Sequence, residues 1–231
     1  MKRTYIKLIL PLICLIFMAS TCDVDYENNR RIVVSGKITD EAGNPLADIP
    51  VRTFAEFYLL GKTTTDSSGD FEFISLESDY ENLLIRVNYL IDDDFGLIES
   101  PYTGIQLINA QDGRPQSNYK LGTLILKNTA NLQLNFINTP GDTNTLSYNL
   151  SFSDTNCRTV LFNEEGLPGE TECYPLHTYT GNFDESSEDF QLKVSSLLGS
   201  TVDFTYHLNN GAAQTITIPL NNTQTTYDFE Y

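Results

Sequence analysis

Hydrophobic and polar residues alternate in short runs along most of the chain. In Phe71-Glu72-Phe73 two aromatic residues flank a charge, as in a strand that packs one face on a core and exposes the other. Turn residues (Asp, Gly, Asn and Pro) separate these runs. In the first half the pattern predicts seven strands, over residues 32–38, 48–55, 57–65, 70–76, 83–90, 103–108 and 121–127.

The second half alternates in the same way. Leu132, Leu134 and Phe136 fall on one side of one predicted strand, and a tight hairpin turn is expected at 209–211. The fold prediction is therefore all-β, with one β-sandwich over 32–128 and a second over 129–231, antiparallel and immunoglobulin-like or similar. Its strands are expected over residues 132–137, 146–152, 158–162, 189–195, 202–208, 213–220 and 225–231.

The first 21 residues have the layout of a secretory signal peptide. Lys2, Arg3 and Lys7 form a basic start, an apolar run of eleven residues follows over 8–18, and small residues precede Cys22. Eleven residues are too few to span a bilayer as a helix, which needs about 20. The segment 1–21 is predicted to direct export.

Cys22 resembles the lipid-attachment cysteine of bacterial lipoproteins, whose thiol is acylated, for example with palmitate. The acidic stretch after it, within a predicted tether over 22–31, resembles that of surface lipoproteins of the Bacteroidetes. The resemblance implies a lipid anchor in the outer membrane, on the cell surface or the periplasmic face, with the membrane as a partner. Simple secretion with a spare thiol at Cys22 is the alternative.

Charge excludes one class of partner. Without the three basic residues of the leader, 11 of the 14 basic residues remain against 31 acidic ones, a formal net charge of −20. Because phosphate binding requires concentrated Lys and Arg, nucleic acid is not an expected partner.

Cys157 and Cys173 are the only cysteines after Cys22. In an oxidising compartment two thiols within reach usually pair, so we predict a disulfide. The alternative is a metal site, but with only His177 nearby the ligand set is incomplete. No cofactor is expected.

Two phrases of the first half, VSGKITDEAGNPLADIPV and TTTDSSGDFEF, resemble the signature of carboxypeptidase regulatory-like domains, which are transthyretin-like sandwiches. In the zinc carboxypeptidases this domain carries no catalytic residues, so the resemblance implies a fold and no reaction. The matching positions are Gly36, Asp40, Gly43, Pro45, Leu46, Val51, Thr65, Asp66, Gly69, Phe71 and Phe73.

Candidate catalytic and metal-binding residues are few. The only histidines are His177 and His207, and His207 is expected to point outward from its strand. Since nucleophilic catalysis needs an oriented base, no catalytic residue is predicted. Asp92, Asp93 and Asp94 are the best candidates for calcium ligands, and a solvated loop is the alternative.

The predicted function is a non-catalytic surface module that binds a glycan, a protein or an envelope component. Tyr58, Tyr89, Tyr102 and Tyr179 are candidates for a sugar-stacking platform, although core packing explains tyrosines equally well. The alternative is a structural or accessory subunit of an outer-membrane uptake complex, and a hydrolase is a third class.

Overall fold

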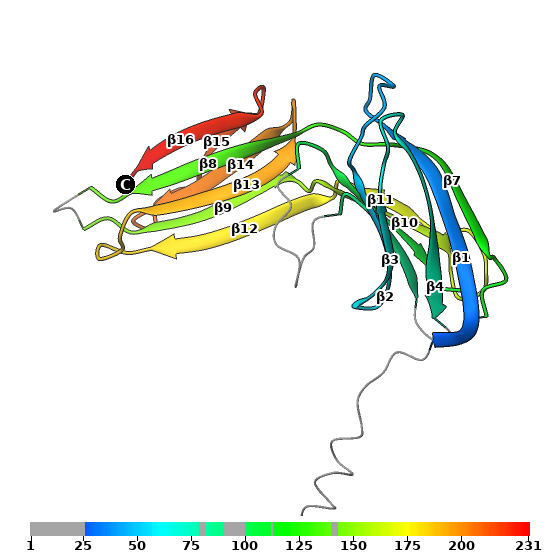
Figure 1. Ribbon diagram of the computed structural model, residues 1–231. Coiled ribbons are helices and arrows are strands. Elements are labelled where there is room, and N and C mark those ends of the chain that lie inside the picture. The colour runs from blue at the N-terminus through cyan, green and yellow to red at the C-terminus, as the bar shows by residue number, and fades with distance from the viewer. Residues whose placement is uncertain (1–25, 79–81, 90–99, 112, 140–142) are drawn as a thin grey trace, which may run out of the picture.

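The computed structural model describes residues 26–78, 82–89, 100–111, 113–139 and 143–231, in which every regular element is a β-strand. Sixteen strands form four sheets, and the sheets pack in pairs as two sandwiches (Figure 1). This confirms the prediction of an all-β fold built from sandwiches.

The first sandwich packs a three-stranded sheet, in the order β4-β1-β7, on a six-stranded sheet, in the order β11-β10-β6-β5-β2-β3. Alternate residues of the fourth strand, including Phe71 and Phe73, are buried between them, as predicted. The strands are β1 (Tyr26–Thr39), β2 (Pro50–Ala55), β3 (Tyr58–Thr64), β4 (Asp70–Ser78), β5 (Leu83–Val87), β6 (Gly104–Asn109), β7 (Asn118–Ile125), β10 (Asn156–Phe162) and β11 (Thr171–Cys173).

The second sandwich packs a sheet in the order β12-β9-β14-β15 on a sheet in the order β13-β8-β16. Leu132, Leu134 and Phe136 lie in its core, as their spacing predicts. It is not purely antiparallel, because β16 pairs parallel with β8. The strands are β8 (Thr129–Ile137), β9 (Leu146–Ser153), β12 (Leu176–Phe183), β13 (Phe190–Leu197), β14 (Thr201–Leu208), β15 (Gln214–Pro219) and β16 (Gln224–Glu230).

The chain is not divided as cleanly as predicted between 32–128 and 129–231. Strands β10 and β11 follow β9 in sequence but belong to the first sandwich, where β10 pairs parallel with β6 and places Cys157 opposite Ile105. Cys157 is buried in the core of the first sandwich, and Leu161 packs against that core. Alternation predicts that a strand forms but not which sheet it joins, so this exchange was not visible in the sequence.

Part of the predicted tether over 22–31 is a β-strand in the structure. Its last six residues belong to β1, which pairs with β4 from Tyr26↔Ser78 onward, across a register shift before Arg31. The Arg30 guanidinium donates hydrogen bonds to the carbonyl oxygens of Arg114 and Gln116. Backbone pairing therefore orders a segment whose side chains are polar enough to suggest a spacer.

Three turns of the first sandwich share one geometry. Oδ1 of Asp40, Asp66 and Asn163 each accepts hydrogen bonds from the backbone N–H groups two and four residues later, at 2.8–3.0 Å. A glycine three residues after each has φ between 76° and 85°, which favours Gly. The turns at Asp40 and Asp66 separate predicted strands, as expected for turn residues.

The predicted hairpin at 209–211 is confirmed. Asn209 and Asn210 have φ of 51° and 57°, and Gly211 N–H donates to Leu208 C=O at 2.8 Å. Positive φ at both central residues is the requirement of a type I′ turn.

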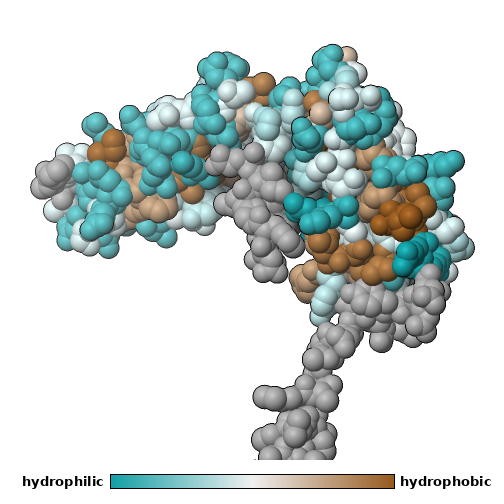
Figure 2. Space-filling model, viewed as in Figure 1, coloured by the Kyte–Doolittle hydropathy of each residue, from teal (hydrophilic) through white to brown (hydrophobic). Residues whose placement is uncertain are grey.

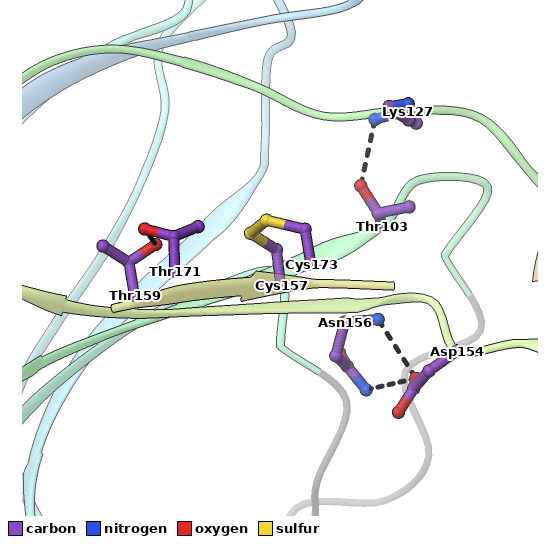
Figure 3. Close-up of a disulfide and its surroundings, with 8 residues drawn as sticks. All are labelled: Thr103, Lys127, Asp154, Asn156, Cys157, Thr159, Thr171 and Cys173. Atoms are coloured by element: carbon purple, nitrogen blue, oxygen red, sulfur yellow. Dashed lines mark hydrogen bonds between the residues drawn. A yellow bond between two sulfur atoms is a disulfide. The ribbon is translucent and has the colours of Figure 1, made fainter. Parts of the chain in front are cut away.

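The predicted disulfide between Cys157 and Cys173 is present. It joins directly opposed residues of β10 and β11, and the hydroxyl of Thr171 donates to that of Thr159 at 3.2 Å further along the hairpin (Figure 3). The bond staples a local hairpin, in contrast to the bridge between facing sheets of an immunoglobulin domain.

Candidate functional site

The outer face of the sheet β13-β8-β16 carries polar side chains on all three strands. On β8 the even-numbered residues point into the core, so the odd-numbered residues face outward. The register places Gln191 of β13 and Asp228 of β16 on either side of Asn135. We call this surface the amide face: its outward residues are Asn131, Gln133, Asn135, Ile137, Gln191, Lys193, Ser195, Gln224, Thr226, Asp228 and Glu230.

Hydrogen bonds between neighbouring strands fix the side chains of the amide face. The Asn135 amide Nδ2 donates to Asp228 Oδ1 at 2.6 Å, and Asn135 Oδ1 accepts from Nε2 of Gln191 at 3.0 Å. Ser195 Oγ donates to Asn131 Oδ1 at 2.5 Å. The face is therefore held in one arrangement before any ligand arrives, which lowers the entropy cost of binding.

An open hollow of about 410 Å³ lies at one end of the amide face. Its lining residues are Asn135, Phe136, Ile137, Asp189, Phe190, Gln191 and Asp228. Two carboxylates and two amides thus meet around one space. The ring of Phe190 lies on the inward face of β13, because Phe190 pairs with the buried Phe136 and stacks on its ring.

Asp189 and Phe190 are positioned by the segment that joins β12 to β13. Asp189 Oδ1 accepts the backbone N–H of Asn138 at 2.9 Å, and the Asn138 amide donates to the carbonyl of Ser187 at 2.8 Å. Hydrogen bonds from Ser186 lower the pKa of Asp184 at the start of this turn. The ring of Phe190 packs on Phe183 on the core side, with 5.6 Å between centroids, and this contact anchors the start of β13.

These groups suit a neutral polyhydroxylated ligand. Amides donate and accept hydrogen bonds and carboxylates accept them, which matches the two roles of a sugar hydroxyl. Because Asp189 and Asp228 both line the hollow, an anionic ligand is disfavoured.

No family model and no curated protein sequence matches the chain. Among solved structures, the chain is similar to the Bacillus anthracis TIE protein, at 12% identity over 88% of this chain and 34% of that one, with a TM-score of 0.31. A streptococcal ancillary pilin is similar at 10% identity over 88% and 63%, with a TM-score of 0.29. The shaft pilin SpaA from Lactobacillus rhamnosus GG is similar at 12% identity over 87% and 97%, with a TM-score of 0.26. The chain thus spans about a third of the TIE protein and just under two thirds of the ancillary pilin.

The four candidate tyrosines do not form one platform. Tyr58 and Tyr89 lie near opposite ends of β2, since Tyr58 pairs with Ala55 while the backbone of Asn88 donates to Pro50. Tyr102 packs against the first core, and Tyr179 lies on β12 of the second sandwich.

The two histidines occupy separate places on strands that flank β9. The His177 ring packs on Phe152, with 5.3 Å between centroids. His207 lies on the opposite side of its strand from Tyr206 and Leu208, which pack on the core, and its Nδ1 is 2.9 Å from the Gly211 carbonyl oxygen. His207 therefore points outward, as predicted.

Several sequence predictions fall outside the described residues. Cys22 lies in 1–25, and the calcium candidates Asp92, Asp93 and Asp94 lie in 90–99. Within the described ranges, no group of three or more His, Cys, Asp or Glu side chains is arranged to hold a metal ion. Nor does any helix there have the length and apolar character needed to cross a membrane.

The amide face was not predicted from the sequence, although part of its signal is visible there. Asn131, Gln133 and Asn135 alternate with the apolar residues of β8. The contribution of Asp228 was hidden, because β16 is far away in sequence.

Proposed function

We propose that this chain is an exported, lipid-anchored, non-catalytic surface module that binds a neutral glycan at the hollow of the amide face. The leader and Cys22 support the export and the anchor. One observation supports the ligand class: the side chains of Asn135, Gln191 and Asp228 converge on a single hollow. The two histidines, the usual source of a general base, lie on the other sheet.

The binding mode follows from the geometry of the face. Adjacent hydroxyls of a sugar ring bond to the carboxylate of Asp228 and to the amides of Asn135 and Gln191. The existing bond between Asn135 and Asp228 holds both groups in place, so binding needs little rearrangement. Further sugar units extend along β8 toward Gln133 and Asn131.

A panel of neutral oligosaccharides, screened on an array and then titrated calorimetrically, tests this proposal. Asp228→Ala is expected to weaken binding of a selected sugar by at least about tenfold, since a hydrogen bond to a charged group contributes about 1.5–3 kcal/mol. Gln191→Ala removes an amide that lines the hollow, so it is expected to weaken binding as well.

Asp203→Ala is the matched control, because Asp203 is an exposed carboxylate on β14 of the opposite sheet. Its affinity is expected to equal that of the wild type, and each variant is first checked for an unchanged melting temperature. Failure of every neutral sugar to bind, or equal binding by the three variants, would contradict the proposal.

A further inference from the structure

Strand β12 is the edge of its sheet and pairs with β9 alone among the described strands. An edge strand presents a row of backbone N–H and C=O groups that can pair with another strand. Six of the eight residues of β12 are exposed. Leu176 is 74% and Tyr179 41% exposed, so both faces of the strand are open to solvent.

β12 differs from the other edge strands of the molecule. The four described sheets have eight edge strands, and proteins usually protect such strands with charge, proline, bulges or short length. The sequence of β12, LHTYTGNF, has no acidic residue, Lys, Arg or Pro, and its pairing with β9 has no register shift. The other seven edges carry Asp70 and Glu72 (β4), Lys120 (β7), Glu172 (β11), Lys62 (β3), Pro219 (β15), Lys193 (β13), and Asp228 and Glu230 (β16).

The backbone of β12 is nevertheless firmly seated on its own sheet. Tyr148 of β9 lies across Gly181, where an added Cβ would be 2.5 Å from the tyrosine hydroxyl oxygen. The Tyr179 ring stacks on Tyr148, with 6.4 Å between centroids. Burial raises the pKa of Tyr148 to about 12, so this contact stays uncharged at neutral pH. The strand is thus an ordered template.

The inward face of β12 extends beyond the opposite sheet. Its own sheet has four strands and the facing sheet has three, so His177 and Tyr179 point to the core side yet remain exposed. Figure 1 shows β12 along the open border of the second sandwich, and Figure 2 shows apolar surface among hydrophilic residues on that lobe. A strand added beside β12 would cover these side chains with its own alternate residues.

Charge around β12 favours one kind of occupant. The turn 184–189 directly after it has the sequence DESSED, with four carboxylates, and Glu172 lies four residues before its start. If two copies were joined by antiparallel β12 strands, the acidic turn 184–189 of each copy would lie near Glu172 and the start of β12 of the other copy. Like charges then oppose self-pairing, whereas a partner with basic ends is attracted.

We propose that β12 is a strand-addition site for an extended segment of another polypeptide, apolar at alternate positions and with Lys or Arg at its ends. Main-chain hydrogen bonds to the free edge supply affinity, and the apolar side chains cover Tyr179 and His177. This site lies on the opposite sheet from the glycan hollow. The two sites share the turn 184–189, which carries Asp189, and neither test substitutes a residue of that turn.

The test uses the purified full-length chain and a synthetic peptide, KKTVTVTVKK, titrated by fluorescence anisotropy. Thr180 is exposed on β12, so Thr180→Lys is expected to weaken binding about tenfold and Thr180→Glu to strengthen it severalfold. The same charge change at Thr226→Lys, on β16, is the matched control and should have a much smaller effect. A peptide of equal charge with proline at its central valine should not bind, because proline cannot donate to the ladder.

Hydrogen exchange gives a second readout. The amides of β12 are expected to become protected when the peptide binds, while those of β16 stay unchanged. Equal binding by the Thr180→Lys and Thr226→Lys variants, equal binding of the proline peptide, or no protection of β12 would overturn the proposal. A dimer without peptide that Thr180→Lys dissociates would also overturn it, in favour of a second copy as the occupant.

Discussion

The three Asx-type turns of the first sandwich show what a single side chain contributes. Oδ1 of Asp40, Asp66 or Asn163 accepts two backbone N–H groups that the turn leaves without a ladder partner. For Asp40, the side-chain and backbone hydrogen bonds from Asn44 lower the pKa of the carboxyl. Because Asn163 forms the same two bonds without a charge, the acceptor oxygen is the common requirement.

Replacing Asp66 tests this interpretation. Asp66→Ala removes the acceptor for the N–H groups of Ser68 and Asp70, and it is expected to lower the free energy of unfolding by about 1 kcal/mol. Asp66→Asn keeps Oδ1, as at Asn163, and should stay close to the wild type. Urea unfolding measures both, and an equal loss in the two variants would show that charge, not the acceptor, matters.

A second side-chain interaction is the buried pair of Glu77 and Arg114, with 2.9 Å between Glu77 Oε1 and Arg114 Nε. The two side chains are only 1% and 4% exposed, and Arg114 also donates to the Ser78 carbonyl. It joins the end of β4 to the segment before β7. No feature of the sequence predicted this pair, because 37 residues separate its members.

The hairpin of β10 and β11 is an element whose role depends on its placement. β10 adds the fifth strand to a sheet of the first sandwich, and the short β11 is held to it by the Cys157–Cys173 bond. Asp154 Oδ1 accepts hydrogen bonds from the backbone N–H and from the side-chain amide of Asn156, and these bonds fix the backbone at the start of β10 (Figure 3).

Removal of the disulfide is expected to destabilise the first sandwich. The closed loop of 16 residues corresponds to about 3 kcal/mol by the chain-entropy relation. The double variant Cys157→Ser/Cys173→Ser should therefore unfold at lower urea in non-reducing buffer and match the wild type measured with dithiothreitol. A stability equal to that of the oxidised wild type would contradict this expectation.

In the whole molecule, the two sandwiches are joined at three places along the chain. The chain passes between them after β7, between β9 and β10, and between β11 and β12. The last two crossings are bonded to each other, since Asp154 N–H donates to the Pro175 carbonyl at 2.8 Å. We therefore expect the full chain to unfold in one cooperative transition.

A fragment of residues 26–128 tests this linkage. It lacks β10, so β6 becomes an exposed edge and Cys157 no longer fills its place in the core. The fragment is expected to unfold at a markedly lower temperature than the full chain, as followed by circular dichroism. Addition of the oxidised peptide 154–175 should restore part of the loss, and a fragment as stable as the full chain would disprove the dependence.

The sequence by itself determined most of the strands, their inward faces and several turns. Period-two alternation identified Leu132, Leu134 and Phe136 as core residues, and Asn209-Asn210-Gly211 specified a hairpin, because both signals arise within a few residues. It missed β11, which has only three residues, and β12, whose residues are mostly exposed on both faces and therefore do not alternate.

Only the tertiary structure decided which strands became neighbours. The sheet that β10 joins, the parallel pairing of β16 with β8, the convergence of Asn135 with Asp228, and the open edge of β12 all depend on residues far apart in sequence. Alternation is a local property, whereas strand pairing is a choice among distant partners of similar pattern. The fold class was therefore predictable, and both proposed binding surfaces were not.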